Sequence, residues 1–202
     1  MKTNISIRRS LIAFTLLGSV SSQAAIVASG IRDLAISNTF QGLYLDVDAG
    51  TVVAEETVGW DINPFFSGEA VANSPSFQPV RTTVNVSSAI LNLSFGQTVN
   101  TASIFASGYA GSDTHVGNGI GKFVSGSEGF IGFKLTTNGG SGPYFGWMRL
   151  TLSNTGSGGV IHEWAYEDSG TAITVGAIPE PSALALWIAG TGCLILRRKR
   201  LG

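Results

Sequence analysis

The sequence predicts an all-β fold for the central part of the chain, in the form of an antiparallel β-sandwich or jelly roll. Short runs of β-branched and aromatic residues alternate with clusters of Gly, Asn, Ser and Pro, a pattern typical of strands joined by turns. Glycine accounts for 27 of the 202 residues, and no segment sustains an apolar repeat of helical period. Charged residues make up only 12% of the chain, which excludes charge-driven disorder and argues against a coiled coil.

The expected strands follow the β-branched and aromatic runs. Apolar residues alternate with others at Ile131, Phe133 and Leu135, and again over 91–95, so one face of each strand should meet a core and the other water. The alternation changes phase near residues 88 and 89, which indicates a turn or bulge. In chain order the expected strands are 43–47, 51–54, 82–86, 89–95, 103–106, 130–136, 144–152, 160–166 and 171–175, with glycine-rich loops at 107–121, 138–143 and 155–159.

Charge is distributed unevenly along the chain. Of the 12 Lys and Arg residues, three lie in residues 1–9 and four in residues 197–200. Residues 25–178 therefore hold twelve carboxylates against five basic side chains. An acidic body of this kind cannot neutralise phosphates, so no nucleic-acid partner is expected. The two basic clusters each flank an apolar run, which is typical of membrane-directed segments.

The N-terminal segment, residues 1–24, has the pattern of a secretion signal. Positive charge in residues 1–9 precedes an apolar run over 10–20, and small residues stand at Ser22 and Ala24. Cleavage is expected after Ala24. The alternative is an uncleaved membrane helix, but the apolar run is shorter than the roughly 20 residues that span a bilayer.

The C-terminal segment, residues 179–202, joins an extended peptide to a short apolar helix and a basic end. Pro179, Glu180 and Pro181 favour an extended conformation because proline restricts its own φ and the residue before it. The apolar run from Ala183 to Leu196 would rise about 21 Å as a helix, short of a hydrocarbon core of about 30 Å. Positive charge beyond it keeps that end cytoplasmic and the body outside. The basic residues are Arg197, Arg198, Lys199 and Arg200.

This ending resembles the PEP-CTERM sorting signal of Gram-negative bacteria, because the motif, the helix and the Arg-rich end occur in that order at the C-terminus. The resemblance implies recognition of Pro179, Glu180 and Pro181 by exosortase, a membrane-embedded cysteine transpeptidase-like enzyme. It also implies transient retention in the inner membrane, then delivery to the cell surface or medium in species that make exopolysaccharide and biofilm. A permanent anchor and a lipid-anchor signal are the alternatives, and the basic end argues against the second.

A second resemblance covers about 50 residues of the body. The segments concerned read as three adjacent strands and a final edge strand, in which Trp147 and Trp164 should bury large areas. They resemble a module found in many PEP-CTERM proteins, whose biochemical role is undefined. The segments are GFIGFKL (129–135), YFGWMRLTL (144–152), HEWAYE (162–167) and GTAITVGA (170–177).

Enzymatic motifs are absent from the body, and neither an enzyme nor a cofactor is expected. His162 and Glu163 begin like a zinc-protease helix, but Tyr166 stands where the second histidine is required. His115 lies in a glycine-rich segment and is expected to be a solvated loop residue. The only cysteine, Cys193, lies in the C-terminal apolar run and is read as a small apolar residue.

Three functions remain open for the body. It is expected first to be a structural or adhesive protein of the cell surface or extracellular matrix. The first alternative is a module that binds carbohydrate through Trp60, Trp147 and Trp164, or Ca²⁺ through Asp46 and Asp48, although the rest of a calcium loop is absent and no metal site is assigned. Tyr109, Tyr144 and Tyr166 complete the aromatic candidates. The second alternative is a glycosidase that uses two of the carboxylates Glu55, Glu56, Asp61, Glu163, Glu167 and Asp168.

Overall fold

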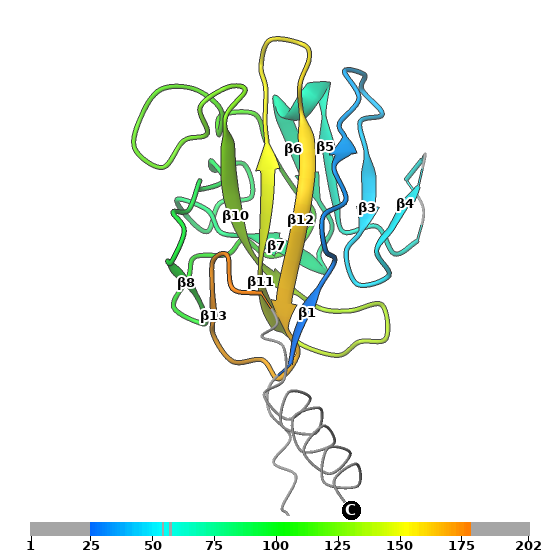
Figure 1. Ribbon diagram of the computed structural model, residues 1–202, viewed down its shortest axis with the longest axis vertical. Helices are drawn as coiled ribbons and strands as arrows, with labels where there is room; N and C mark the ends of the chain where they lie inside the picture. Colours follow the sequence, from blue (N-terminus) through cyan, green and yellow to red (C-terminus); the bar gives the residue numbers. More distant parts are fainter. Residues whose placement is uncertain (1–24, 54, 57, 179–202) are drawn as a thin grey trace, which may run out of the picture.

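The described part of the chain is all-β with antiparallel sheets, consistent with a β-sandwich, which confirms the predicted all-β class; the jelly-roll form stays a prediction. The computed structural model describes residues 25–53, 55–56 and 58–178 (Figure 1). The strands are β1 (Ile26–Ala28), β2 (Leu34–Ala35), β3 (Tyr44–Asp46), β4 (Thr51–Val53), β5 (Ile62–Phe65), β6 (Ala70–Asn73), β7 (Phe77–Pro79), β8 (Thr98–Val99), β9 (Ala110–Ser112), β10 (Glu128–Leu135), β11 (Tyr144–Thr151), β12 (Val160–Glu167) and β13 (Ile173–Thr174), with one 3₁₀ turn, η1 (Phe66–Gly68).

The first sheet is built around three long consecutive strands. Its order is β1-β12-β11-β10-β7, and β2 pairs with the far end of β12. The predicted alternation on β10 is confirmed, because Ile131, Phe133 and Leu135 are all fully buried. A bulge shifts the register of β11 against β12 between Arg149 and Leu150.

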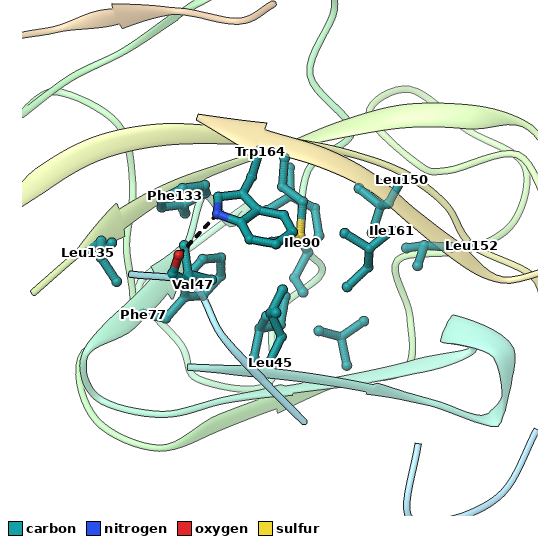
Figure 2. Packing of buried hydrophobic residues seen from close by; sticks show 14 of the residues in the cluster. Leu45, Val47, Phe77, Ile90, Phe133, Leu135, Leu150, Leu152, Ile161 and Trp164 are labelled. Carbon is teal, nitrogen blue, oxygen red and sulfur yellow. Dashed lines mark hydrogen bonds between the residues drawn. The ribbon is translucent and has the colours of Figure 1, made fainter. Parts of the chain in front are cut away.

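The second sheet has the order β4-β3-β5-β6-β9 and packs against the first through one shared core. Leu45 and Val47 on the second sheet face Phe133 and Leu150 on the first (Figure 2). The indole N–H of Trp164, on β12, donates a 3.1 Å hydrogen bond to the carbonyl oxygen of Val47 and so joins the two sheets (Figure 2). Burial of each such large apolar side chain contributes about 1.5–3 kcal/mol, which makes this core the main source of stability.

The outer face of the first sheet is also covered, which the sequence did not predict. Phe145 and Trp147 on β11 pack there against Val99, Ile173 and Val175, which come from the small β8–β13 ribbon and its flank. The expectation that one face of each strand meets water is therefore wrong for β11. The sequence of a strand that is buried on both faces is typically a continuous apolar run, and the segment YFGWM (144–148) of β11 has this pattern.

Three predicted strands are wrong. Residues 82–86 form bends and are exposed, and 89–95 make only isolated bridges through Ile90 and Leu93. The segment 103–106 makes a single bridge, between Phe105 and Val80. Phe95 lies in a turn just after the bridge of Leu93 to Phe130 on β10, and its side chain is exposed. A turn is present at 86–87, close to the predicted change of phase.

The strands that the sequence analysis missed include β5, β6 and β9 of the second sheet. Pro64 lies inside β5, where a proline normally argues against a central strand. It is tolerated because β3 pairs with β5 at one position only, Leu45 with Ile62. β9 lies within 107–121, which its glycines had marked as a loop.

Both ends of the described body lie at the same end of the sandwich, below β1 and β13 in Figure 1. The η1 turn between β5 and β6 lies at the opposite end. No helix in the described part of the chain is long and apolar enough to cross a membrane. The expected signal segment 1–24 and sorting segment 179–202 lie outside the described residues.

Candidate functional site

A groove runs over the outer face of the second sheet, on β5, β6 and β9. Its floor is built from small residues, because Ala72 pairs with both Asn63 on β5 and Gly111 on β9, and Ala70 pairs with Phe65. A Cβ atom added at Gly111 would have no heavy atom within 4 Å. The floor is therefore flat and open to solvent at this point.

One half of the groove has an aromatic wall made of Tyr44, Trp60 and Tyr109. The ring of Trp60 lies 5.3 Å from that of Tyr44, edge to face, and 6.2 Å from that of Tyr109. Trp60 is 8% exposed, whereas Tyr109 is 67% exposed. Together with Asn63 these rings line a cavity of about 370 Å³. Tyr109 is the exposed ring of this wall, so it can stack on a flat, partly apolar ligand, and the exposed side chains of Glu56 and Ser87 in the same lining can hydrogen-bond to the edges of that ligand.

The other half of the groove is lined by Phe65, Phe66, Glu69 and Asp113, around a cavity of about 680 Å³. The two cavities share Ser87 and Gly111 and so form one continuous groove. The exposed ring of Phe40 lies 5.7 Å from Phe65 and 6.2 Å from Phe66, which extends the apolar wall.

Two features of this second half are unusual for a structural surface. Phe66 and Ser67 have φ values of 50° and 60°, the left-handed region that non-glycine residues rarely adopt. Backbone of this kind costs of order 1–3 kcal/mol per residue and is concentrated at functional sites. Ser112 borders the same cavity, but it pairs with the core residue Val71, so its hydroxyl lies on the inner face of the sheet and has no hydrogen-bond partner among the described residues.

Behind the floor, Arg81 is fully buried and has no carboxylate partner in the described part of the chain. It donates hydrogen bonds to Asn73 Oδ1 at 2.9 Å and to the Ser88 carbonyl oxygen at 2.6 Å. Burial lowers the pKa of Arg81 to about 10. The guanidinium does not line either cavity and serves to hold Asn73 and the 82–88 segment in place.

The predicted pair Asp46 and Asp48 is joined by Asp61, which the sequence analysis had placed only among the glycosidase candidates. Ligand atoms of the three carboxylates lie within 4.8 Å of one another. Asn138 donates to Asp46 Oδ2 at 2.7 Å through its side chain and to Asp48 Oδ2 at 3.1 Å through its backbone. Ala49 N–H donates to Asp46 Oδ1.

Asp61 is the most deeply placed of the three carboxylates. Its two oxygens accept hydrogen bonds from Ser76 Oγ at 2.6 Å and Val47 N–H at 2.8 Å. Burial raises the pKa of Asp61 to about 6, and burial also raises the pKa of Asp48, with Asp46 adding to it. Of the six carboxylate oxygens, five accept protein hydrogen bonds, and Asp48 Oδ1 is the one without a partner among the described residues. Most of this cluster's hydrogen-bonding capacity is therefore used by the protein.

The two histidines occupy different surroundings. The expectation of a solvated His115 is wrong, because its ring is fully buried and Nε2 lies 2.9 Å from the Gly68 carbonyl oxygen. Burial lowers the pKa of His115. His162 lies on strand β12, as expected, with Nδ1 2.7 Å from Asp33 Oδ1 and Nε2 3.0 Å from Thr151 Oγ1. Because Arg32 and Asp33 also donate backbone N–H groups to the His162 carbonyl oxygen, this contact fixes the N-terminal segment to the sheet.

The sequence-predicted aromatic candidates separate into two groups. Trp147 and Trp164 are 1% and 3% exposed, and their indole N–H groups donate to carbonyl oxygens inside the protein. They are core residues with no free face, and Tyr144 and Tyr166 stack on each other at 5.8 Å beside the same core. Trp60 and Tyr109 are the two candidates that the structure brings together at the groove.

The glycosidase carboxylates are distributed over separate hydrogen-bond networks. Glu163 pairs with Arg149 at 2.8 Å on the outer face of the first sheet. Although burial alone would raise the pKa of Glu167, hydrogen bonds from Ser169 and Thr171 lower it. Asp168 Oδ1 accepts from the Ala25 backbone N–H at 3.0 Å, and Glu55 and Glu56 are exposed. None of these networks includes the Asp61 cluster.

Several groove residues were missed by sequence reasoning, namely Tyr44, Phe65, Phe66 and Gly111. The sequence signal for Tyr44 and its neighbour Asn63 is the alternation of side chains along a strand. Because Leu45 and Ile62 point into the core, Tyr44 and Asn63 lie on the opposite face of the sheet. The sorting residues Pro179, Glu180 and Pro181 lie outside the described residues. No family model matches the chain, and no curated protein or solved structure matches it either.

Proposed function

We propose that this chain is an exported cell-surface protein whose body attaches to polysaccharide through the groove on the second sheet. The observation that carries the proposal is the combination of a flat floor at Ala72 and Gly111 with the aromatic wall of Trp60 and Tyr109. Sugar rings present apolar C–H faces and polar edges, which match aromatic faces and side-chain amides. An adhesive role of this kind suits a body with few basic residues and without an assigned catalytic motif.

The ends of the chain support delivery to the surface. The proposed route is removal of residues 1–24 after Ala24, transient retention by the helix from Ala183 to Leu196, and processing by exosortase at Pro179–Pro181. Because both ends of the described body lie at one end of the sandwich and η1 lies at the other, a body held by either terminus would present the η1 end of the groove away from the membrane (Figure 1).

Binding is tested with the variant Gly111→Leu, which fills the groove. Gly111 does not have a positive φ and its Cβ position is open, so leucine enters empty space without disturbing the sheet. Gly139→Leu is the matched control, since Gly139 is exposed in a loop outside the groove, has no positive φ, and its added Cβ would meet only Thr137 Oγ1 at an ordinary contact distance of 3.9 Å. With the full chain in mild detergent, titration against neutral and amino-substituted hexasaccharides should give binding for the unaltered chain and for Gly139→Leu. Gly111→Leu should bind at least about tenfold more weakly.

A second variant, Tyr109→Ala, removes an exposed ring and should also weaken binding by about tenfold, because one stacking face is lost. Equal affinity for Gly111→Leu, Tyr109→Ala and the unaltered chain would overturn the groove as the binding site. Absence of binding to every saccharide would overturn the proposed function of the body.

The delivery route has its own test, the intact mass of the protein recovered from the cell surface or medium. A chain that begins at Ala25 and ends near Pro179–Pro181 is the expected product. A chain that still carries Arg197–Arg200 would show a permanent anchor and would contradict processing by exosortase.

A further inference from the structure

We propose that the groove selects polysaccharides that carry free, protonated amino groups, such as polymers of glucosamine, over neutral and uronic acid polymers. This inference rests on the proposed function and adds the chemical class of the ligand. It comes from the half of the groove formed by Phe65, Phe66, Glu69 and Asp113, where aromatic rings and carboxylates line one cavity.

Aromatic rings and negative charge occur together in this half of the groove. An ammonium group is attracted to the face of an aromatic ring within about 6 Å and to a carboxylate by direct ion pairing. Phe65 and Phe66 lie 5.4 Å apart with their planes tilted by 56°, and both line the cavity. Glu69 and Asp113 are both exposed and line the same cavity. One cavity therefore offers a protonated amine both aromatic rings and carboxylates.

Positive charge is absent from the described lining of the groove. Among the described residues that line the two cavities, none is Lys or Arg, and Glu56 adds a third carboxylate at the Trp60 end. The buried cation Arg81 donates to Asn73 behind the floor and does not line the groove. A uronic acid polymer would place its carboxylates against this acidic rim without a compensating cation, and like charges in contact disfavour binding.

A basic peptide has the same charge, but the shape of the groove favours a polysaccharide. The groove continues over the small residues Ala70, Ala72 and Gly111 to a second aromatic wall at Trp60 and Tyr109. Two aromatic walls on one flat floor suit a chain of stacked rings. Oligolysine therefore enters the test as the competing ligand.

The experiment measures the affinity of the full chain, in mild detergent, for four probes: a glucosamine hexamer, its fully N-acetylated form, a uronic acid hexamer and hexalysine. The glucosamine hexamer should bind at least about tenfold more tightly than the other three. Glu69→Gln combined with Asp113→Asn should remove that preference, and affinity for the N-acetylated hexamer should stay unchanged. Glu55→Gln, an exposed carboxylate outside the groove lining, is the matched control and should change nothing.

The outcomes separate this inference from the proposed function. Equal binding of the glucosamine and N-acetylated hexamers, lost in Gly111→Leu, would overturn the amino-group selectivity and leave polysaccharide binding standing. Tighter binding of hexalysine than of any saccharide would overturn the choice of ligand class. If no probe binds, both the inference and the proposed function are wrong.

Discussion

Replacing Asp61 with asparagine should raise the free energy of unfolding at neutral pH. Asp61 is buried in the second sheet beside Asp46 and Asp48, and its burial raises its pKa from 3.8 to about 6. Because the pKa of Asp61 is higher in the folded state than in the unfolded state, the folded state binds the proton more tightly. Deprotonation of Asp61 therefore destabilises the folded state. The free energy of unfolding therefore falls as the pH rises from about 4 to about 6, and the loss is complete above that window.

The size of the effect follows from the pKa difference. A shift from 3.8 to about 6 corresponds to about 3 kcal/mol at 1.36 kcal/mol per unit, most of which develops between about pH 4 and pH 7. Asparagine keeps both local hydrogen bonds, since its Oδ1 can accept from Val47 N–H and its amide can donate to Ser76 Oγ. Asp61→Asn should thus equal the unaltered chain near pH 4 and exceed it by about 3 kcal/mol at pH 7.

Urea unfolding followed by tryptophan fluorescence, at steps from about pH 4 to pH 7, measures this difference. The same substitution at Asp113, an exposed carboxylate, should change the free energy of unfolding by less than about 0.5 kcal/mol at any pH. A difference between Asp61→Asn and the unaltered chain that does not grow with pH would refute the reasoning. So would a loss of stability at pH 7.

Three further predictions concern the core and its titration. Gly146→Ala should lower the free energy of unfolding by about 1–3 kcal/mol in urea titrations, because the added Cβ would collide with the ring of Phe133; an unchanged midpoint would contradict this packing. Trp164→Phe removes the hydrogen bond to the Val47 carbonyl oxygen and should cost about 2–4 kcal/mol by the same measurement, whereas a cost below about 1 kcal/mol would show that the bond between the sheets contributes little. Burial lowers the pKa of His115, so the stability that depends on neutral His115 is fully present above its unfolded pKa of about 6.5 and is lost as the pH falls below that value. His115→Gln should weaken this loss of stability at acidic pH, and an unchanged pH profile of the free energy of unfolding would refute the prediction.

The strands that sequence reasoning located correctly are those in which local pattern and tertiary environment agree. Ile131, Phe133 and Leu135 alternate with less buried residues on β10, and the long β10–β12 meander was predicted to within two residues at each end. The predictions failed where the environment overrides the pattern. Residues 82–86 are rich in β-branched side chains but have no neighbouring strand to pair with over their length.

The groove shows a similar limit. Asp46 and Asp48 were identified because they are close in sequence, whereas Asp61 joins them only through the pairing of β3 with β5. Trp60 and Tyr109 were identified by residue type, but their contact depends on β9 pairing with β6. Small residues such as Gly111 carry no chemical signal in a sequence, and their role as a floor depends on a sheet whose central strands were not predicted.

Hydrogen exchange of the full chain with and without a saturating glucosamine hexamer tests the central claim most directly, because it locates the ligand on the fold. β9 is an edge strand, so its outward N–H groups should exchange readily in the free protein. The account predicts slower exchange with ligand at residues 107–113 and 65–72, and no change on β10–β12. Protection confined to β10–β12, or no protection at 107–113 under conditions where the hexamer binds, would contradict the groove as the polysaccharide site.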